Sequence, residues 1–224
     1  MTLFKEIADI QTSKMLDLPV PKLKGGDYKT VVAPKSDELA EYVNKLAERS
    51  EIIRNGCDPR DDNMLLVTND GRKAALDLRM IDPSMPDLPN SKINMAVENI
   101  YRIWLENKED KLTQLVFCDL STPKNDGSFN VYDDIKNKLI ARGVPADEIE
   151  YIHNAKTNPQ KLKLFEDMRN GTKRILIGST SKMGAGMNVQ DKLLALHHLD
   201  CPWRPSDIEQ REGRILRQGN QNDE

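Results

Sequence analysis

Residues 174–188 read RILIGSTSKMGAGMN, and this stretch decides the fold of the chain. Its first five residues form a short apolar run, which is typical of a strand buried inside a parallel sheet. Hydroxyl side chains follow, and then Gly184 and Gly186, so that backbone amides of the loop can approach a phosphate closely. A second apolar run at 193–199 ends at Asp200. The order of strand, glycine-containing loop and strand predicts an α/β domain that binds ligands beyond the carboxyl ends of its strands.

Earlier segments supply the other layers of such a domain. The runs at 113–118 and 149–152 predict two more strands, because they are apolar or alternate in polarity. Residues 129–143 and 159–171 carry apolar side chains at helical spacing, and each segment ends with a glycine. A long helix is expected to begin at Ser91. The predicted fold class is therefore α/β, with a parallel sheet and helices on both faces.

The stretch QREGRILRQG at 210–219 carries the most specific chemistry. It follows a rigid Trp-Pro turn at 202–205, and Ser206 is expected to cap the helix that holds it. On that helix Arg214 and Arg217 would share one face, because they are three residues apart. Two permanently charged guanidinium groups side by side suit a polyphosphate that gains negative charge during reaction. An isolated Arg-x-x-Arg is more often a solvated basic helix face, so the neighbouring motifs decide between the two interpretations.

Together these motifs resemble the second RecA-like lobe of superfamily-two helicases, and within that group the Swi/Snf-type translocases. The similarity covers about residues 91–221. The matching positions are Leu115, Val116, Phe117 and Cys118 in the fourth motif; Thr180, Gly184, Gly186 and Asn188 in the fifth; and Asp200, Trp203, Pro205, Gln210, Gly213, Arg214, Arg217 and Gly219 leading into and through the sixth. The chain departs from the usual pattern at 182–183 and at 215–216, and neither change removes a group expected to touch phosphate.

The resemblance implies a role for each group of residues. Arg214 and Arg217 would be arginine fingers that reach the β- and γ-phosphates of ATP bound by another lobe. The nucleotide-facing residues would be Gly184, Gly186, Asn188, Gln210 and Gly213. The residues near the DNA backbone would be Ser179, Thr180, Lys182 and Asn154, which position a strand without reading its sequence. The chain is therefore expected to be the second motor lobe of an ATP-dependent DNA helicase or translocase.

The chain contains no Gly-x-x-x-x-Gly-Lys-Ser/Thr sequence, the loop that cradles the phosphates in P-loop enzymes. The acidic pairs at 37–38 and 147–148 lie at an expected helix start or in a loop, not at the end of an apolar strand where such a pair would hold magnesium. ATP and Mg²⁺ are therefore expected to be held mainly by an N-terminal RecA-like lobe of the same parent protein. Alone, the chain is expected to be inactive as an ATPase.

Composition narrows the possible partners. The 224 residues carry a net charge of −3, so the overall charge does not indicate that the chain binds a nucleic acid. Cys57, Cys118 and Cys201 are far apart, and the adjacent His197 and His198 would point to opposite faces of a strand, so no metal site is predicted. The sequence shows neither a signal peptide nor an apolar run long enough to span a bilayer. A cytoplasmic location without membrane contact is expected.

Residues 1–90 differ in character from the rest. Residues 1–35 are rich in proline and lysine and are interpreted as a linker from a preceding lobe. Ser36 is expected to cap a helix. The strand-like runs at 64–68 and 73–80 flank Asn-Asp-Gly-Arg, which favours a β-hairpin. The predicted organisation is a linker at 1–35, an α+β extension with a β-hairpin at 36–90, and the RecA-like lobe at 91–224.

Two other functions remain open from the sequence. A methyltransferase that uses S-adenosylmethionine would explain a glycine loop after one strand and Asp200 at the end of the next. It would leave the arginine pair unexplained, and the interval after Gly186 is too short for a full helix. A non-catalytic interaction module would explain only the missing phosphate loop. The stretches at 72–77 and 156–158 also resemble helicase parts of very large phage and plasmid proteins that join a Swi/Snf-like motor to a DNA adenine methylase.

Overall fold

The computed structural model describes residues 19–124, 126–183 and 186–222. The lobe is built on a parallel sheet with the strand order β2-β3-β1-β4. Its strands are β1 (Thr113–Phe117), β2 (Ile149–Tyr151), β3 (Ile175–Gly178) and β4 (Leu193–His198). The bounds of each strand lie within one residue of those predicted from the apolar runs, and the α/β fold class is confirmed.

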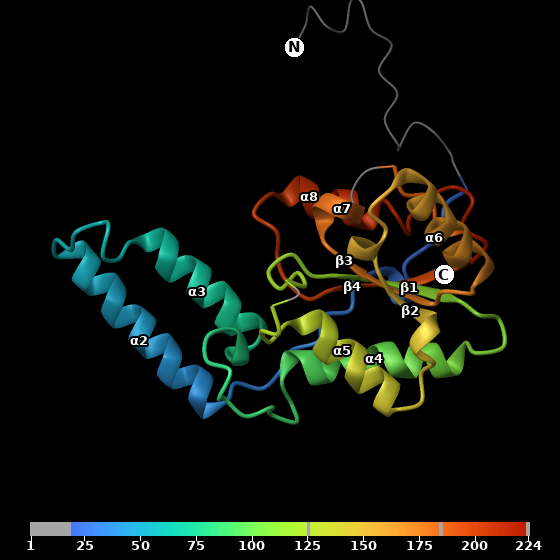
Figure 1. Cartoon of the computed structure of the whole chain (residues 1–224). Coiled ribbons are helices and arrows are strands. Elements are labelled where there is room, and N and C mark those ends of the chain that lie inside the picture. Colours follow the sequence, from blue (N-terminus) through green and yellow to red (C-terminus); the bar gives the residue numbers. More distant parts are fainter. Residues whose placement is uncertain (1–18, 125, 184–185, 223–224) are drawn as a thin grey trace, which may run out of the picture.

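Helices cover both faces of the sheet (Figure 1). One face carries α4 (Lys92–Glu106) and α5 (Val131–Ala141), and the other carries α6 (Asn158–Asn170), α7 (Thr180–Met183) and α8 (Pro205–Glu212). Short 3-10 turns are η1 (Lys24–Gly26), η2 (Leu78–Met80), η3 (Ala146–Glu148), η4 (Ile152–Asn154) and η5 (Gln190–Lys192). In the part of the chain that the structure describes, no helix has the length and apolar character needed to cross a membrane.

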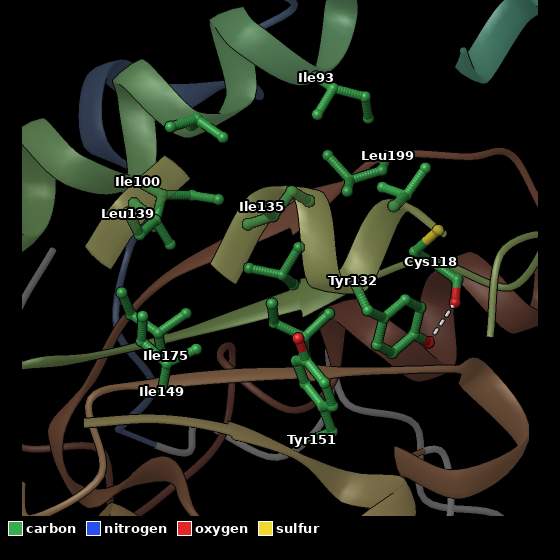
Figure 2. Close-up of a cluster of buried hydrophobic side chains, with 14 of the residues drawn as sticks. Ile93, Ile100, Cys118, Tyr132, Ile135, Leu139, Ile149, Tyr151, Ile175 and Leu199 are labelled. Atoms are coloured by element: carbon green, nitrogen blue, oxygen red, sulfur yellow. Dashed lines mark hydrogen bonds between the residues drawn. The ribbon is translucent and has the colours of Figure 1, made fainter. Parts of the chain in front are cut away.

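The core between the sheet and the α4–α5 layer contains the stripe predicted for the long helix. The residues of that stripe, all buried, are Ile93, Val97, Ile100 and Trp104. Figure 2 shows Tyr132 of α5 in the same cluster, with its hydroxyl directed at the end of β1. This hydroxyl donates to the backbone carbonyl of Cys118 at 2.6 Å. Because the bond replaces lost water contacts, the ring can fill the core without an unsatisfied polar group.

A second core lies on the opposite face of the sheet. Leu115 and Phe117 of β1 point into it, whereas Val116 points into the first core. The α6 side chains Leu164 and Phe165 complete the packing. Since both faces of β1 are covered, its last three residues, 115–117, are all apolar rather than alternating.

The two ends of α6 show how local sequence sets the bounds of an element. Thr157 accepts a hydrogen bond from the backbone N–H of Gln160, and the Gln160 side chain accepts one from the N–H of Thr157. At the other end Gly171 has a φ of 79°, in the left-handed region. A Cβ at this position would lie 2.6 Å from the carbonyl oxygen of Lys111. Glycine is therefore required by both the backbone angle and the close contact.

A buried arginine ties α4 to the edge of the sheet where the strands begin. Arg174 precedes β3 and is 1 % exposed. Its guanidinium donates to the backbone carbonyls of Trp104 at 2.8 Å, Asn107 at 2.9 Å and Leu112 at 3.1 Å. These carbonyls lie at and beyond the end of α4, where the helix has no further backbone N–H groups to donate to them. Arg174 thus satisfies several backbone acceptors at once.

The β-hairpin predicted within 64–80 is wrong. Residues Met64–Leu76 form α3, which packs antiparallel to α2 (Asp37–Arg54) as a helical hairpin that projects from the lobe (Figure 1). Tertiary contacts override the turn propensity of the Asn-Asp-Gly-Arg stretch. Asp70 pairs with Arg49 of α2 at 3.0 Å, and Gly71 allows Leu46 to approach closely, since an added Cβ would lie 3.4 Å from its Cδ1 atom. The extension is therefore helical, not α+β.

The base of the helical hairpin is fastened to the lobe at two points. Arg79, in η2, pairs with Asp134 of α5 at 2.9 Å. Arg72, on α3, donates to the backbone carbonyl of Cys201 at 2.8 Å and lies over the ring of Trp203, 4.5 Å from its centroid. The second contact is made in the loop between β4 and α8, which includes Trp203, one of the residues that resemble the approach to the sixth helicase motif.

Residues 1–18 of the predicted linker lie outside the described residues. The described remainder of that segment reaches α8, where the hydroxyl of Tyr28 donates to the carboxylate of Glu212 at 3.0 Å. The assignment of 1–35 as a linker and the boundary between residues 90 and 91 stay predictions.

Candidate functional site

The carboxyl ends of three strands meet at one edge of the sheet, as the parallel topology requires. Asp119 follows β1, Ser179 and Thr180 follow β3, and Asp200 follows β4. The central positions of β1 and β3 in the sheet explain why their carboxyl ends lie side by side. Ligands of doubly wound sheets bind at this edge.

Arg211, near the end of α8, joins these strand ends into one network. Its side chain is fully buried. Nε donates to the hydroxyl of Thr180 at 2.7 Å, and Nη2 donates to carboxylate oxygens of Asp119 at 2.7 Å and of Asp200 at 3.2 Å. Nη1 donates to the backbone carbonyl of Asp200 at 3.0 Å. A buried guanidinium is stable here because its charge is paired and its donors are engaged.

The two carboxylates are also held by backbone groups. Asp119 accepts from the N–H of Thr180 at 2.6 Å and from its hydroxyl at 2.8 Å. Asp200 accepts from the N–H groups of Asp119 and Leu120 through its second oxygen. The network therefore fixes the first turn after β3 relative to the ends of β1 and β4. Sequence reasoning identified Thr180 and Asp200 but missed Asp119 and Arg211, because a buried ion pair between distant segments leaves no local pattern.

A pocket of about 640 Å³ opens beside this network. It is lined by Asp119, Thr122, His153, Ser179, Thr180, Ser181, Lys182, Asp207 and Gln210. Hydroxyl groups and one lysine predominate on the wall formed by the residues after β3. Such groups donate hydrogen bonds to phosphate oxygens. The structure thus brings together Ser179, Thr180 and Lys182, the residues predicted to lie near DNA.

His153 lines the pocket, whereas Asn154, predicted for the DNA side, is directed elsewhere. The Nδ2 group of Asn154 donates to the Glu150 carboxylate at 2.7 Å. Burial, and then the charge of Lys182, lower the pKa of His153. The imidazole is therefore neutral at neutral pH and contacts the pocket as a hydrogen-bonding group without charge.

The predicted helix around the arginine pair is shorter than expected. α8 begins at Pro205, so Ser206 lies inside the helix instead of capping it, because proline suits the first helical position. The helix ends at Glu212, and Gly213 follows with a non-helical ψ of 0°. The N–H of Arg214 bonds to the carbonyl of Arg211, three residues back, at 3.1 Å. This tighter turn ends the α-helical pattern, so the prediction that Arg214 and Arg217 share a helix face is wrong.

The two arginines nevertheless lie near each other and near the loop after β3. Arg214 is half-buried and its Nη1 donates to the backbone carbonyl of Met187 at 3.2 Å. Burial, and then the charge of Arg217, lower the pKa of Arg214. Arg217 is exposed. The Nε atom of Arg214 is buried, while its Nη1 reaches the connection between β3 and β4 at Met187. The role of both arginines as arginine fingers stays a prediction.

The other residues predicted to face a nucleotide occupy different places. Gly186 and Asn188 flank Met187 and are exposed, so they lie beside the residue that Arg214 contacts. Gln210 lines the strand-end pocket, together with the residues predicted for DNA. Gly213 ends α8. Gly184 lies outside the described residues.

Comparison with known families agrees with this geometry. The family model of the helicase conserved C-terminal domain matches residues 92–219. The chain belongs to this family. The match spans the sheet, the strand-end pocket and the arginine segment, and it begins where α4 begins. No match to the chain was found among curated proteins.

The structure of this helicase C-terminal domain argues against a methyltransferase. In the methyltransferase interpretation, Asp200 would hold a ribose. Its oxygens are engaged by Arg211 and by two backbone N–H groups, and the residue is 8 % exposed. The chain also passes from Gly186 to η5 and β4 without an intervening α-helix.

The same contacts test whether the helicase C-terminal domain could hold Mg²⁺. Asp119 and Asp200 are the carboxylates at the strand ends, and both are paired with Arg211. A cation at this point would face a buried positive charge, so these side chains do not fit a magnesium site. Among residues 19–124, 126–183 and 186–222, no group of three or more His, Cys, Asp or Glu side chains is arranged to hold a metal ion.

Proposed function

We propose that the chain is the second motor lobe of an ATP-dependent DNA helicase or translocase. The observation that carries the proposal is that the connection from β3 to β4 borders both halves of the site. Its first residues, 179–182, line the strand-end pocket, and Met187 accepts a hydrogen bond from Arg214. A segment in this position would link contact with nucleic acid to contact with nucleotide.

The proposed DNA contacts are Ser179, Thr180 and Lys182, with His153 in place of Asn154 because it lines the pocket. Hydroxyl, amide and ammonium groups donate to phosphate oxygens and read no base edges, so binding would be independent of sequence. With a net charge of −3, the chain by itself would bind DNA weakly and lose affinity steeply as salt rises.

The proposed nucleotide contacts are Arg214 and Arg217. Gly186 and Asn188 would lie beside them, at the edge of a cleft between this lobe and a companion lobe. A companion RecA-like lobe would bind ATP and Mg²⁺, which supply the phosphoryl-transfer chemistry when bound. Burial, and then the charge of Arg217, lower the pKa of Arg214. The second of these causes means that the two guanidinium groups repel each other. A polyphosphate between them would relieve this repulsion and favour binding of the more negative species.

We also propose that the lobe is of the Swi/Snf type and comes from a large phage or plasmid protein. The support is the spacing of Trp203, Pro205, Gln210, Arg214 and Arg217, together with the stretches at 72–77 and 156–158. The sequence encoded upstream tests the motor assignment on which this rests, since a phosphate-binding loop followed by an Asp-Glu pair is required there. A DNA adenine methylase encoded in the same protein would support the phage or plasmid origin, and its absence would contradict it.

The arginine pair is tested in the complete motor protein. Arg214→Ala and Arg217→Ala are each expected to lower the rate of DNA-stimulated ATP hydrolysis by about 10³-fold, as for other arginine fingers. Turnover is measured at saturating ATP and DNA, with thermal unfolding in parallel to show that the fold is kept. Arg60→Ala is the matched control, because the Arg60 side chain is 89 % exposed beyond the end of α2, and it should leave the rate unchanged.

Wild-type rates in both arginine variants would contradict the proposal. The 224-residue chain alone is expected to show no hydrolysis with or without DNA, and measurable turnover would reveal a phosphate site that the proposal lacks. A complete protein that neither hydrolyses ATP nor binds DNA would favour the non-catalytic interaction module.

A further inference from the structure

Arg211 lies between the two halves of the proposed site but is suited to contact neither ligand. Its side chain is 0 % exposed, so a substrate cannot reach the guanidinium without displacing its partners. All of those partners belong to segments that end at the functional edge of the sheet. The side chain is thus placed to act through other residues.

We propose that Arg211 is a positioning residue that couples the DNA-contacting residues after β3 to the arginine segment at 213–217. This inference rests on the proposed function, since it assigns Arg211 a task between two sites that the motor requires.

The DNA side of the coupling is made through Thr180. Its hydroxyl accepts from Arg211 at 2.7 Å and donates to Asp119 at 2.8 Å, and its N–H donates to the same carboxylate. The hydroxyl and N–H of Thr180 are therefore both committed to the Arg211 network. A phosphate that binds at residues 179–182 and draws on Thr180 or repels Asp119 must alter the contacts of Arg211.

The nucleotide side of the coupling is made through the main chain. The carbonyl of Arg211 accepts from the N–H of Arg214 at 3.1 Å, in the tight turn that ends α8. Arg214 in turn donates to the Met187 carbonyl. A shift of Arg211 therefore changes the turn that sets the direction of the Arg214 side chain.

The coupling depends on the shape of the guanidinium as well as on its charge. Three nitrogens of Arg211 reach Thr180, Asp119 and Asp200 simultaneously. A lysine carries the charge on one atom and cannot span these acceptors. Arg211→Lys should therefore keep a positive charge beside the carboxylates of Asp119 and Asp200. It should break the connection between residues 179–182 and residues 213–217.

The chain provides a matched control. Arg174 is also almost fully buried, at 1 % exposed, and is also bound to several acceptors. It lies at the opposite edge of the sheet, where the strands begin. Arg174→Lys makes the same chemical change at similar burial and reports the effect of lost stability alone.

The test is amide hydrogen exchange of the full 224-residue chain with and without a short DNA duplex at low salt. In the wild-type chain and in Arg174→Lys, DNA should slow exchange about tenfold in peptides covering 179–183 and also in peptides covering 213–217. In Arg211→Lys, DNA should still protect 179–183 but leave 213–217 unchanged.

Asp119→Asn, which keeps the side-chain shape, is the second variant should Arg211→Lys fail to fold, and it should give the same uncoupling.

Protection of both segments in the folded Arg211 or Asp119 variant would overturn the inference and leave the proposed function intact. Loss of the 213–217 response in Arg174→Lys would also overturn it, because the effect would then follow from stability. If DNA protected neither segment in the wild-type chain, the proposed DNA contact would fail, and the inference would fail with it.

Discussion

At the scale of single residues, Arg174 and Arg211 meet the cost of burying a charge in different ways. Arg211 has two carboxylates, so its charge is cancelled by ion pairs at 2.7 and 3.2 Å. Arg174 relies on backbone carbonyls, and the Glu148 carboxylate lies 3.8 Å from its Nη1. Burial accordingly lowers the pKa of Arg174, with Glu148 opposing the shift. The carbonyl-bound arginine fastens elements together, whereas the carboxylate-bound arginine sits among groups that a ligand can disturb.

Gly171 offers a test of a single backbone position. Gly171→Ala is expected to lower the free energy of unfolding by about 3 kcal/mol or more, because it adds steric conflict to an unfavourable backbone angle. The Cβ would lie 2.6 Å from the Lys111 carbonyl at a φ of 79°. Chemical denaturation measures the change. Gly143→Ala is the control, with a φ of 97° and no atom within 4 Å of the new Cβ, and it should cost only about 1–2 kcal/mol. Equal losses at the two positions would show that the contact with Lys111 is unimportant.

At the scale of elements, the sequence predicted most of the RecA-like lobe. Buried parallel strands are continuously apolar and end at glycine or charged residues, so β1 and β3 could be located from composition alone. The starts of α2 and α4 were also predicted correctly, at Ser36 and Ser91, whose side chains accept the expected N-cap hydrogen bonds. These signals are local, and at these positions the tertiary contacts agree with them.

The elements that sequence missed depend on contacts between distant segments. The Asn-Asp-Gly-Arg stretch reads as a turn, but Asp70 is paired with Arg49 and Gly71 is packed against Leu46. The end of α8 was placed too late. The apolar and basic spacing continues past Gly213, but at Arg214 and Ile215 the backbone N–H groups bond three residues back and the regular α-helical pattern ends. The sequence therefore predicted a site at the strand ends where the pocket lies, but did not identify Arg211 as the centre of the network beside it.

The helical assignment of α3 has a clear test. Gly71→Ala is expected to raise the free energy of unfolding by about 0.5–1 kcal/mol, because alanine is the better helix former. The new Cβ would lie 3.4 Å from Cδ1 of Leu46, the mobile end of a side chain. Thermal or chemical unfolding measures the gain. Gly56→Ala, at a φ of 109° in the turn after α2, should instead destabilise the chain. A loss of stability in Gly71→Ala would favour the turn that the sequence suggested.

At the scale of the whole molecule, the two edges of the sheet have separate tasks. The edge where strands begin carries Arg174 and the end of α4, which hold the layers together. The edge where strands end carries the pocket, Arg211 and the arginine segment. Because stability and ligand contact are separated in this way, substitutions at one edge can be used as controls for the other.

His197 of β4 predicts how overall stability depends on pH. Burial, followed by nearby positive charge, lowers the pKa of His197 to about 4. The unfolded chain, with histidine pKa values of about 6.5, binds more protons than the folded chain between these limits. Stability is therefore complete above about pH 6.5 and falls as the pH drops towards 4.

This dependence is measured by thermal unfolding across that range. The midpoint is expected to fall by several degrees between about pH 6.5 and 5. His197→Gln should reduce the fall, because glutamine does not titrate and can still donate to Gln114, whose oxygen lies 2.9 Å from Nε2 of His197. An unchanged pH profile in this variant would show that His197 is not responsible.

The attachment of the helical hairpin has a mechanical consequence. α2 has 18 residues, which corresponds to a length of about 27 Å. Its partner α3 and the following turn are anchored to α5 and to the loop before α8 by Arg79 and Arg72. The helical hairpin of α2 and α3 is therefore expected to rotate together with the lobe. For a rigid rotation of about 15° around this base, a size seen in subunit rotations, the far end of the hairpin would move by about 7 Å. A small movement of the lobe at the base would therefore be amplified at the outer surface.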